Sequence, residues 1–117
     1  MWHPLDMSFA NQIIEVDSAR QLACFPVHAI RYTEEDDPYR PILEWLLETG
    51  PHRNVFLFSG GSLSWRVADW SVPPGIGDGF VSIRCLDSGE INLHAFQGSI
   101  FRLDIDTGHI KKIGWSK

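Results

Sequence analysis

A chain of 117 residues falls in the size range of one domain, and 44% hydrophobic residues supply a core that needs neither a metal nor a disulfide. A formal net charge of −5 disfavours nucleic acid as a partner, and no apolar run approaches the roughly 20 residues of a membrane span. The N-terminus lacks a basic start followed by an apolar stretch, which predicts a cytoplasmic protein. We therefore expect a single domain over residues 1–117.

The first third of the chain predicts two strands. Apolar residues place them at about 11–16 and 27–32. The intervening segment 18–25 is predicted as either a short helix or an irregular crossover, because its pattern fits neither period clearly.

A helix is predicted over about 38–49. Asp37 is a good N-cap, Pro38 suits the first helical position, and Gly50 with the following proline ends the run. The apolar residues with helical spacing are Ile42, Leu43, Leu46 and Leu47. They predict that one face of this helix is buried.

Negative charge is concentrated in the first half of the chain. Residues 1–50 carry nine acids against three arginines, a net −6, whereas residues 51–117 carry six acids against seven bases, a net +1. The candidate partner-binding acids are Glu34, Glu35, Asp36, Asp37, Glu44 and Glu48. Such a patch attracts basic protein surfaces. The alternative is a solvated rim that keeps the protein soluble.

The second half predicts strands joined by short turns. The continuous apolar run 55–58 is typical of a central strand covered on both faces, and Leu63, Trp65 and Val67 alternate with polar residues as in a half-buried strand. After a loop at 71–79, four further strands are expected at 80–86, 90–96, 99–105 and 109–115. The chain is therefore predicted as α+β, with a mostly antiparallel sheet, a C-terminal β-meander and one main helix.

Two acidic turns divide the predicted meander, Asp87-Ser88-Gly89 and Asp106-Thr107-Gly108. Aspartate before a glycine that takes positive φ makes a tight hairpin turn. The same triplets carry the paired carboxylates of aspartic proteases, which lie about 3 Å apart. Hairpin turns do not bring these side chains face to face, so we interpret both triplets as turns.

Other candidate chemistry is weaker. The Gly-rich segment 73–79 is followed by a strand, whereas a phosphate loop needs a helix there. The five histidines have no ligand spacing, so no metal and no cofactor are predicted. Cys24 and Cys85 have apolar neighbours, which favours two reduced core thiols. Trp70 lies at a strand end beside a loop, where we expect exposure and a role as a partner-binding anchor.

The region 73–117, with its glycine-punctuated run from Ile100 to Ile110, resembles bacterial immunity proteins of polymorphic or contact-dependent toxin systems. The resemblance implies a non-catalytic inhibitor that binds and neutralises a cognate toxin domain. Toxic nucleases have basic clefts, so the acidic helix and loop would mimic nucleic acid there.

Two other classes of function stay open. A small homo-oligomeric β domain would bind a metabolite on its concave sheet face and the loop 72–79. A small enzyme would need clustered titratable groups, for which the candidates are His94 with Glu90 or Asp104. An edge strand that pairs with a second copy, giving a homodimer, also stays open.

Overall fold

The structure is a computed structural model that describes residues 10, 12–25, 40–50, 52–60, 62–71 and 79–115, without the side chains of 40–43 and 47. Its strands are β1 (Gln12–Glu15), β2 (Arg20–Cys24), β3 (Val55–Ser59), β4 (Ser62–Arg66), β5 (Phe80–Cys85), β6 (Ile91–Ala95), β7 (Ser99–Leu103) and β8 (Ile110–Trp115). The described helix is α1 (Arg40–Thr49). The expected strand at 27–32 lies outside the described residues.

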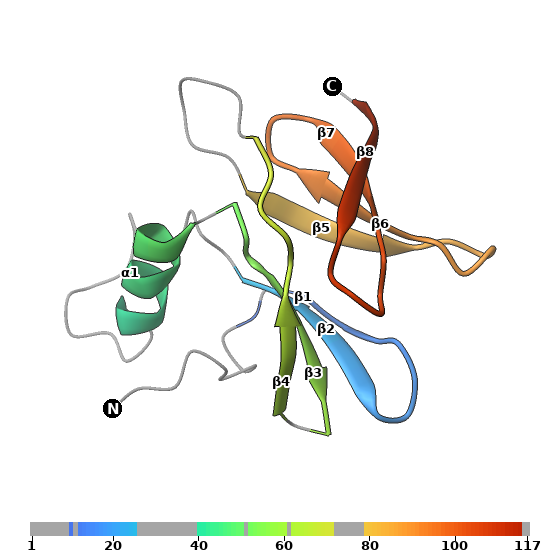
Figure 1. Cartoon of the computed structure of the whole chain (residues 1–117), viewed down its shortest axis with the longest axis horizontal. Coiled ribbons are helices and arrows are strands. Elements are labelled where there is room, and N and C mark those ends of the chain that lie inside the picture. The colour runs from blue at the N-terminus through green and yellow to red at the C-terminus, as the bar shows by residue number, and fades with distance from the viewer. Residues whose placement is uncertain are drawn as a thin grey trace.

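The strands form two four-stranded antiparallel sheets, β1-β2-β3-β4 and β5-β6-β7-β8, here called sheet A and sheet B (Figure 1). The described fold is therefore nearly all-β, and the predicted α+β class with one main helix is wrong. The helical spacing at 38–49 predicts a helix at that place in the chain and nothing about the rest of the fold. It does not reveal that α1 is a short element beside sheet A, while strands supply both layers of the fold.

Part of this error comes from 18–25, which was expected to be a short helix or a crossover. Arg20–Cys24 instead forms β2, paired with β1 on one side and β3 on the other. Leu22, Ala23, Cys24 and Phe25 are all fully buried, so both faces of the strand are covered. A strand covered on both faces shows no alternation, which is why the sequence period did not identify it.

The predicted meander is confirmed. β5 to β8 follow one another in the sheet, and Gly89 and Gly108 take the positive φ expected of the two acidic turns, at 91° and 80°. Buried residues alternate along the two central strands, as in Ile91, Leu93 and Ala95 of β6 and Ser99, Phe101 and Leu103 of β7. One face of sheet B is therefore buried and the other faces outward.

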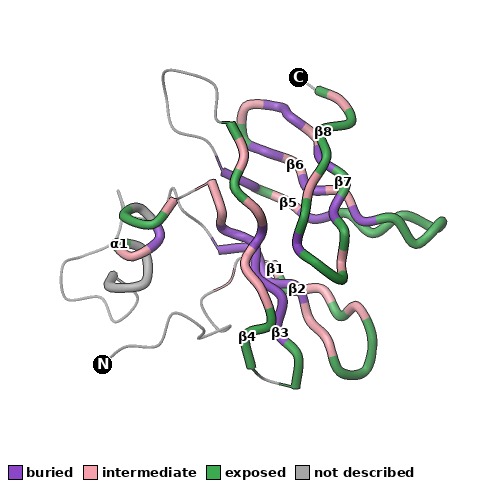
Figure 2. The backbone as a smooth tube through the Cα atoms, in the orientation of Figure 1, coloured by how far each residue is buried: buried purple, intermediate pink, exposed green. Residues whose placement is uncertain are grey.

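The main core lies between the two sheets (Figure 2). Leu22, Cys24, Val55 and Leu57 of sheet A pack in the same cluster as residues of β5, β6 and β7. The opposite face of sheet A is also buried, where Phe56 contacts Trp45 of α1 with ring centroids 6.1 Å apart. The run 55–58 is thus a central strand with both faces covered, as predicted.

The pairing of β3 with β4 differs from the expected alternation. The register of β3 with β4 shifts between Leu57 and Phe58, so that Trp65 pairs with Leu57 but Leu63 pairs with Phe58. Leu63 is consequently 41% exposed instead of sharing the buried face of Trp65.

The two cysteines were predicted to be core thiols, and this is right for one of them. Cys85 is exposed and does not lie in the core. Cys24 is fully buried, and burial raises the pKa of its thiol to about 12.

Amide side chains join the two sheets along the free edge of β5. The Gln12 amide donates to the carbonyl of Ile83 at 3.0 Å and accepts from its N–H at 2.8 Å. Buried Asn54 accepts from the N–H of Phe80 at 2.9 Å and donates to the carbonyls of Phe80 and Phe25, each at 2.8 Å. These bonds satisfy main-chain groups that an edge strand otherwise leaves unpaired.

Candidate functional site

The predicted acidic surface is described in part. Glu44 and Glu48 are exposed on α1, at the i, i+4 spacing that places both on one face of the helix. Leu46, between them in sequence, is fully buried. The four acids at 34–37 lie outside the described residues, so the structure shows the helical part of this candidate surface.

Trp70 does not have the exposure expected of it. Its indole Nε1–H donates to the carbonyl of His52 at 2.7 Å, and its ring lies 4.9 Å from that of Phe101 and 5.4 Å from that of Phe80. The side chain is partly buried against the core between the sheets. Trp115 is the more exposed side chain, at 61%, and its Nε1–H donates to the carbonyl of Gln97 at 3.0 Å. The role of Trp70 in partner binding stays a prediction.

The residues proposed for a small enzyme have other partners. Glu90 forms an ion pair with Arg102 at 3.4 Å, and the Asp104 carboxylate accepts from the N–H of Asp106 at 3.0 Å. Burial, together with the charge of Arg84, lowers the pKa of His94 below its ordinary value. Glu90 and Asp104 thus serve an ion pair and a turn, respectively.

A histidine and carboxylate pair that the sequence analysis did not identify lies beside Trp70. His52 Nε2 hydrogen-bonds to Asp69 Oδ1, and this bond is the first cause that lowers the pKa of the Asp69 carboxyl. The two residues lie 17 positions apart on either side of the β3–β4 hairpin, so no local spacing connects them. The pair holds the segment after β4 against the start of β3.

The outer face of sheet B carries a row of polar and basic side chains. The register pairs Arg84 with Asn92, Asn92 with Arg102, and Arg102 with Lys111, so these four residues cross the sheet from β5 to β8. We call them the basic row. Arg84, Arg102 and Lys111 are exposed, and the row spans three strand spacings, roughly 14 Å.

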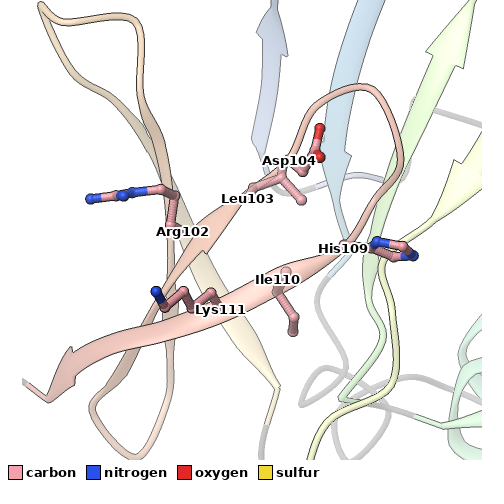
Figure 3. Close-up of a pocket in the computed structure, with 6 residues that line it drawn as sticks. All are labelled: Arg102, Leu103, Asp104, His109, Ile110 and Lys111. Atoms are coloured by element: carbon pink, nitrogen blue, oxygen red, sulfur yellow. The ribbon is translucent and has the colours of Figure 1, made fainter.

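A depression of about 360 Å³ lies at the β8 end of the basic row. It is lined by Arg102, Leu103, Asp104, His109, Ile110 and Lys111. Figure 3 shows Arg102 and Lys111 projecting to the same side of the β7–β8 hairpin, with Asp104 and His109 near its turn. Arg102 and Lys111 lie on the outer face there, whereas Leu103 and Ile110 pack on the core side of the sheet.

Asn92 lies in the middle of the basic row and has an unusual environment. Its Oδ1 is buried and accepts no hydrogen bond from the part of the chain that the structure describes. A buried acceptor without a donor costs about 1–3 kcal/mol. The row therefore combines cations with an acceptor that lacks a donor.

The described part of the chain contains no group of three or more metal-ligating side chains. Among the same residues, no helix is long and apolar enough to cross a membrane. The Asp106 carboxylate, one of the two that the protease pattern would pair, instead lies 3.4 Å from Arg20 Nη1.

Comparison with known proteins identifies no relative: no family model, no curated protein and no solved structure matches this chain. The class that the observations define is a β-rich domain of two packed antiparallel sheets, with an acidic face on α1 and a basic row on sheet B.

Proposed function

We propose that this protein is a non-catalytic binding protein of the immunity type, which neutralises a cognate toxin domain by binding it. The proposal rests on the resemblance of region 73–117 to immunity proteins and on the acidic first half of the chain. The observation that carries it is the exposure of Glu44 and Glu48 on one face of α1, beside a fully buried Leu46.

An exposed acidic face speeds association with a basic surface and sets partner choice more than it sets affinity. Glu34, Glu35, Asp36 and Asp37 precede α1 in the sequence and extend the same charge. The partner is therefore a basic protein domain, such as a toxic nuclease with a basic cleft. Neither a cofactor nor a metal takes part in this function.

The test uses the purified chain as bait in an extract of its native cell. The wild type should capture one basic protein at a one-to-one ratio, and moderate salt should weaken the capture. The captured protein, expressed alone, should arrest growth, and co-expression of the chain should restore it.

Charge reversal on α1 makes the test specific. Glu44→Lys with Glu48→Lys should reduce capture by about tenfold or more, because attraction at two positions becomes repulsion. The matched control, Glu15→Lys with Asp87→Lys, reverses two exposed acids elsewhere and should leave capture unchanged. A captured protein without toxicity, or equal losses in both variants, would contradict the proposal.

A further inference from the structure

The basic row carries three cations in a chain whose net charge is −5, and one of them, Arg102, is partly offset by its ion pair with Glu90 at 3.4 Å. Arg84, Arg102 and Lys111 lie on three of the four strands of sheet B, although they are 18 and 9 residues apart in the sequence. Figure 1 shows α1 beside sheet A and away from β7 and β8. The exposed acids of α1 therefore do not cover the row.

We propose that the outer face of sheet B binds an extended acidic segment of a partner protein along the basic row. This surface is separate from the acidic face of α1 and goes beyond the proposed function. The positive charge of the row requires a negatively charged segment. The arginine and asparagine side chains favour a peptide with carboxylates as that segment.

The arginines favour carboxylates. A guanidinium presents a planar fork of N–H donors that matches a carboxylate with two parallel hydrogen bonds. Arg84 and Arg102 flank Asn92 on adjacent strands, so they lie about 10 Å apart. An extended chain of about four residues covers the row from β5 to β8.

Asn92 favours a peptide over a polynucleotide. Its buried Oδ1 lacks a donor among the described residues, and a peptide supplies main-chain N–H donors together with its carboxylates. A phosphodiester backbone supplies acceptors alone. Its register partners Arg84 and Arg102 are both exposed, so a segment bound along the row reaches the neighbourhood of this atom.

The β8 end of the row supplies two cations close together. Arg102 and Lys111 are register partners on the outer face, whereas their neighbours Leu103 and Ile110 pack on the core side of the sheet. A carboxylate at this end of the segment therefore meets two cations and no apolar surface.

The probes are acetylated hexaglutamate and its neutral counterpart hexaglutamine, titrated into the isotope-labelled chain at low salt and followed by amide NMR shifts. Hexaglutamate should shift the amides of the basic row, and hexaglutamine should not. Each removal of a cation, Arg84→Gln, Arg102→Gln or Lys111→Gln, should weaken binding about threefold, and the triple variant by more than tenfold.

Lys112→Gln is the matched control. Lys111 and Lys112 are adjacent and both exposed, but Lys111 pairs with Arg102 on the outer face, while Lys112 pairs with buried Phe101. Lys112→Gln should therefore leave the affinity for hexaglutamate nearly unchanged. Asn92→Ala should weaken it about threefold without changing the salt dependence, because no charge is removed.

Three results would overturn the proposal: no shift of the row with hexaglutamate, equal losses in Lys111→Gln and Lys112→Gln, or tighter binding of inorganic phosphate or an eight-residue oligothymidylate at the row. Amide spectra of each variant show whether the fold is kept. Capture of the toxin by the acidic face of α1 is measured in a different experiment. The two proposals can therefore fail independently of each other.

Discussion

Among the residues that the structure describes, Asn54 satisfies three main-chain groups with its side chain at the joint between the sheets. Asn54→Ala leaves the N–H and carbonyl of Phe80 and the carbonyl of Phe25 without this partner in a buried site. We expect the free energy of unfolding to fall by about 4 kcal/mol, measured by denaturant titration. Asn92→Ala removes the same amide from a site where Oδ1 is unpaired, and its cost should stay below about 1 kcal/mol. Equal costs would show that Asn54 has no special role.

Gly108 combines a positive φ with a close contact between the sheets. A Cβ atom there would lie 2.8 Å from Cδ2 and Cε3 of Trp65, whose Nε1–H donates to the carbonyl of Ile105 at 3.0 Å. Gly108→Ala should cost about 3 kcal/mol, through backbone strain and displacement of the indole. Gly89→Ala has the same strain, with φ of 91° but open space around it, and should cost about 1 kcal/mol. Thermal unfolding of both variants separates the cost of backbone strain from the cost of displacing the indole.

At the scale of the element, Arg66 of β4 holds α1 on sheet A. Its guanidinium donates to the carbonyls of Arg53 and Gly50 and to Thr49 Oγ1, at 2.7 to 2.8 Å, and lies 4.7 Å from the ring centroid of Trp45. Burial is the main cause that lowers its pKa to about 10. A cation at the C-terminus of a helix also stabilises the helix dipole. The helix is therefore anchored by a residue 17 positions beyond its end.

Arg66→Lys keeps the charge but loses the planar fork, so it cannot make all three bonds. We expect a loss of about 2 kcal/mol in the free energy of unfolding and faster hydrogen exchange in residues 45–50. Arg102→Lys changes an exposed pair with Glu90 and should cost less than about 0.5 kcal/mol. Unchanged exchange in α1 would contradict the anchoring role.

At the scale of the whole molecule, Arg20 connects turns of the two sheets. It contacts Asp17 Oδ2 at 2.8 Å, in the β1–β2 turn, and Asp106 Oδ1 at 3.4 Å, in the β7–β8 turn. The hydrogen bond from the Ala19 N–H is the largest cause that lowers the pKa of the Asp17 carboxyl below its ordinary value, and the bond from the Arg20 side chain is the next. A carboxyl with a lowered folded pKa contributes stability above its unfolded pKa, and this contribution is lost as pH falls through the folded value.

Thermal unfolding should therefore show a midpoint that falls as pH decreases below about 4. Asp17→Asn removes one contributing group, so its midpoint should be lower at pH 6 and should fall less steeply between pH 4 and 2. Asp87→Asn, in the exposed β5–β6 turn, is the matched control and should follow the wild type. A parallel fall in all three proteins would show that Asp17 does not contribute.

The candidate site was predicted in part. The exposure of Glu44 and Glu48 follows from the helical period. The apolar residues mark the buried face of the helix, so polar residues between them lie on the face toward solvent. Trp70 was predicted to be exposed because it lies at a strand end, but the rings of Phe80 and Phe101 and the carbonyl of His52 hold it against the core. Those partners are 10 to 31 residues away, so no local pattern indicates them.

The sequence by itself determined the β-meander, its two acidic turns and the doubly covered strand at 55–58. Turn chemistry and side-chain alternation are local, and they act through residues a few positions apart. The tertiary structure alone decided that β2 is a strand, that Asn54 and Gln12 pair with β5, and that the basic row crosses four strands. These features depend on strand register and on hydrogen bonds between distant residues, which residue spacing does not specify.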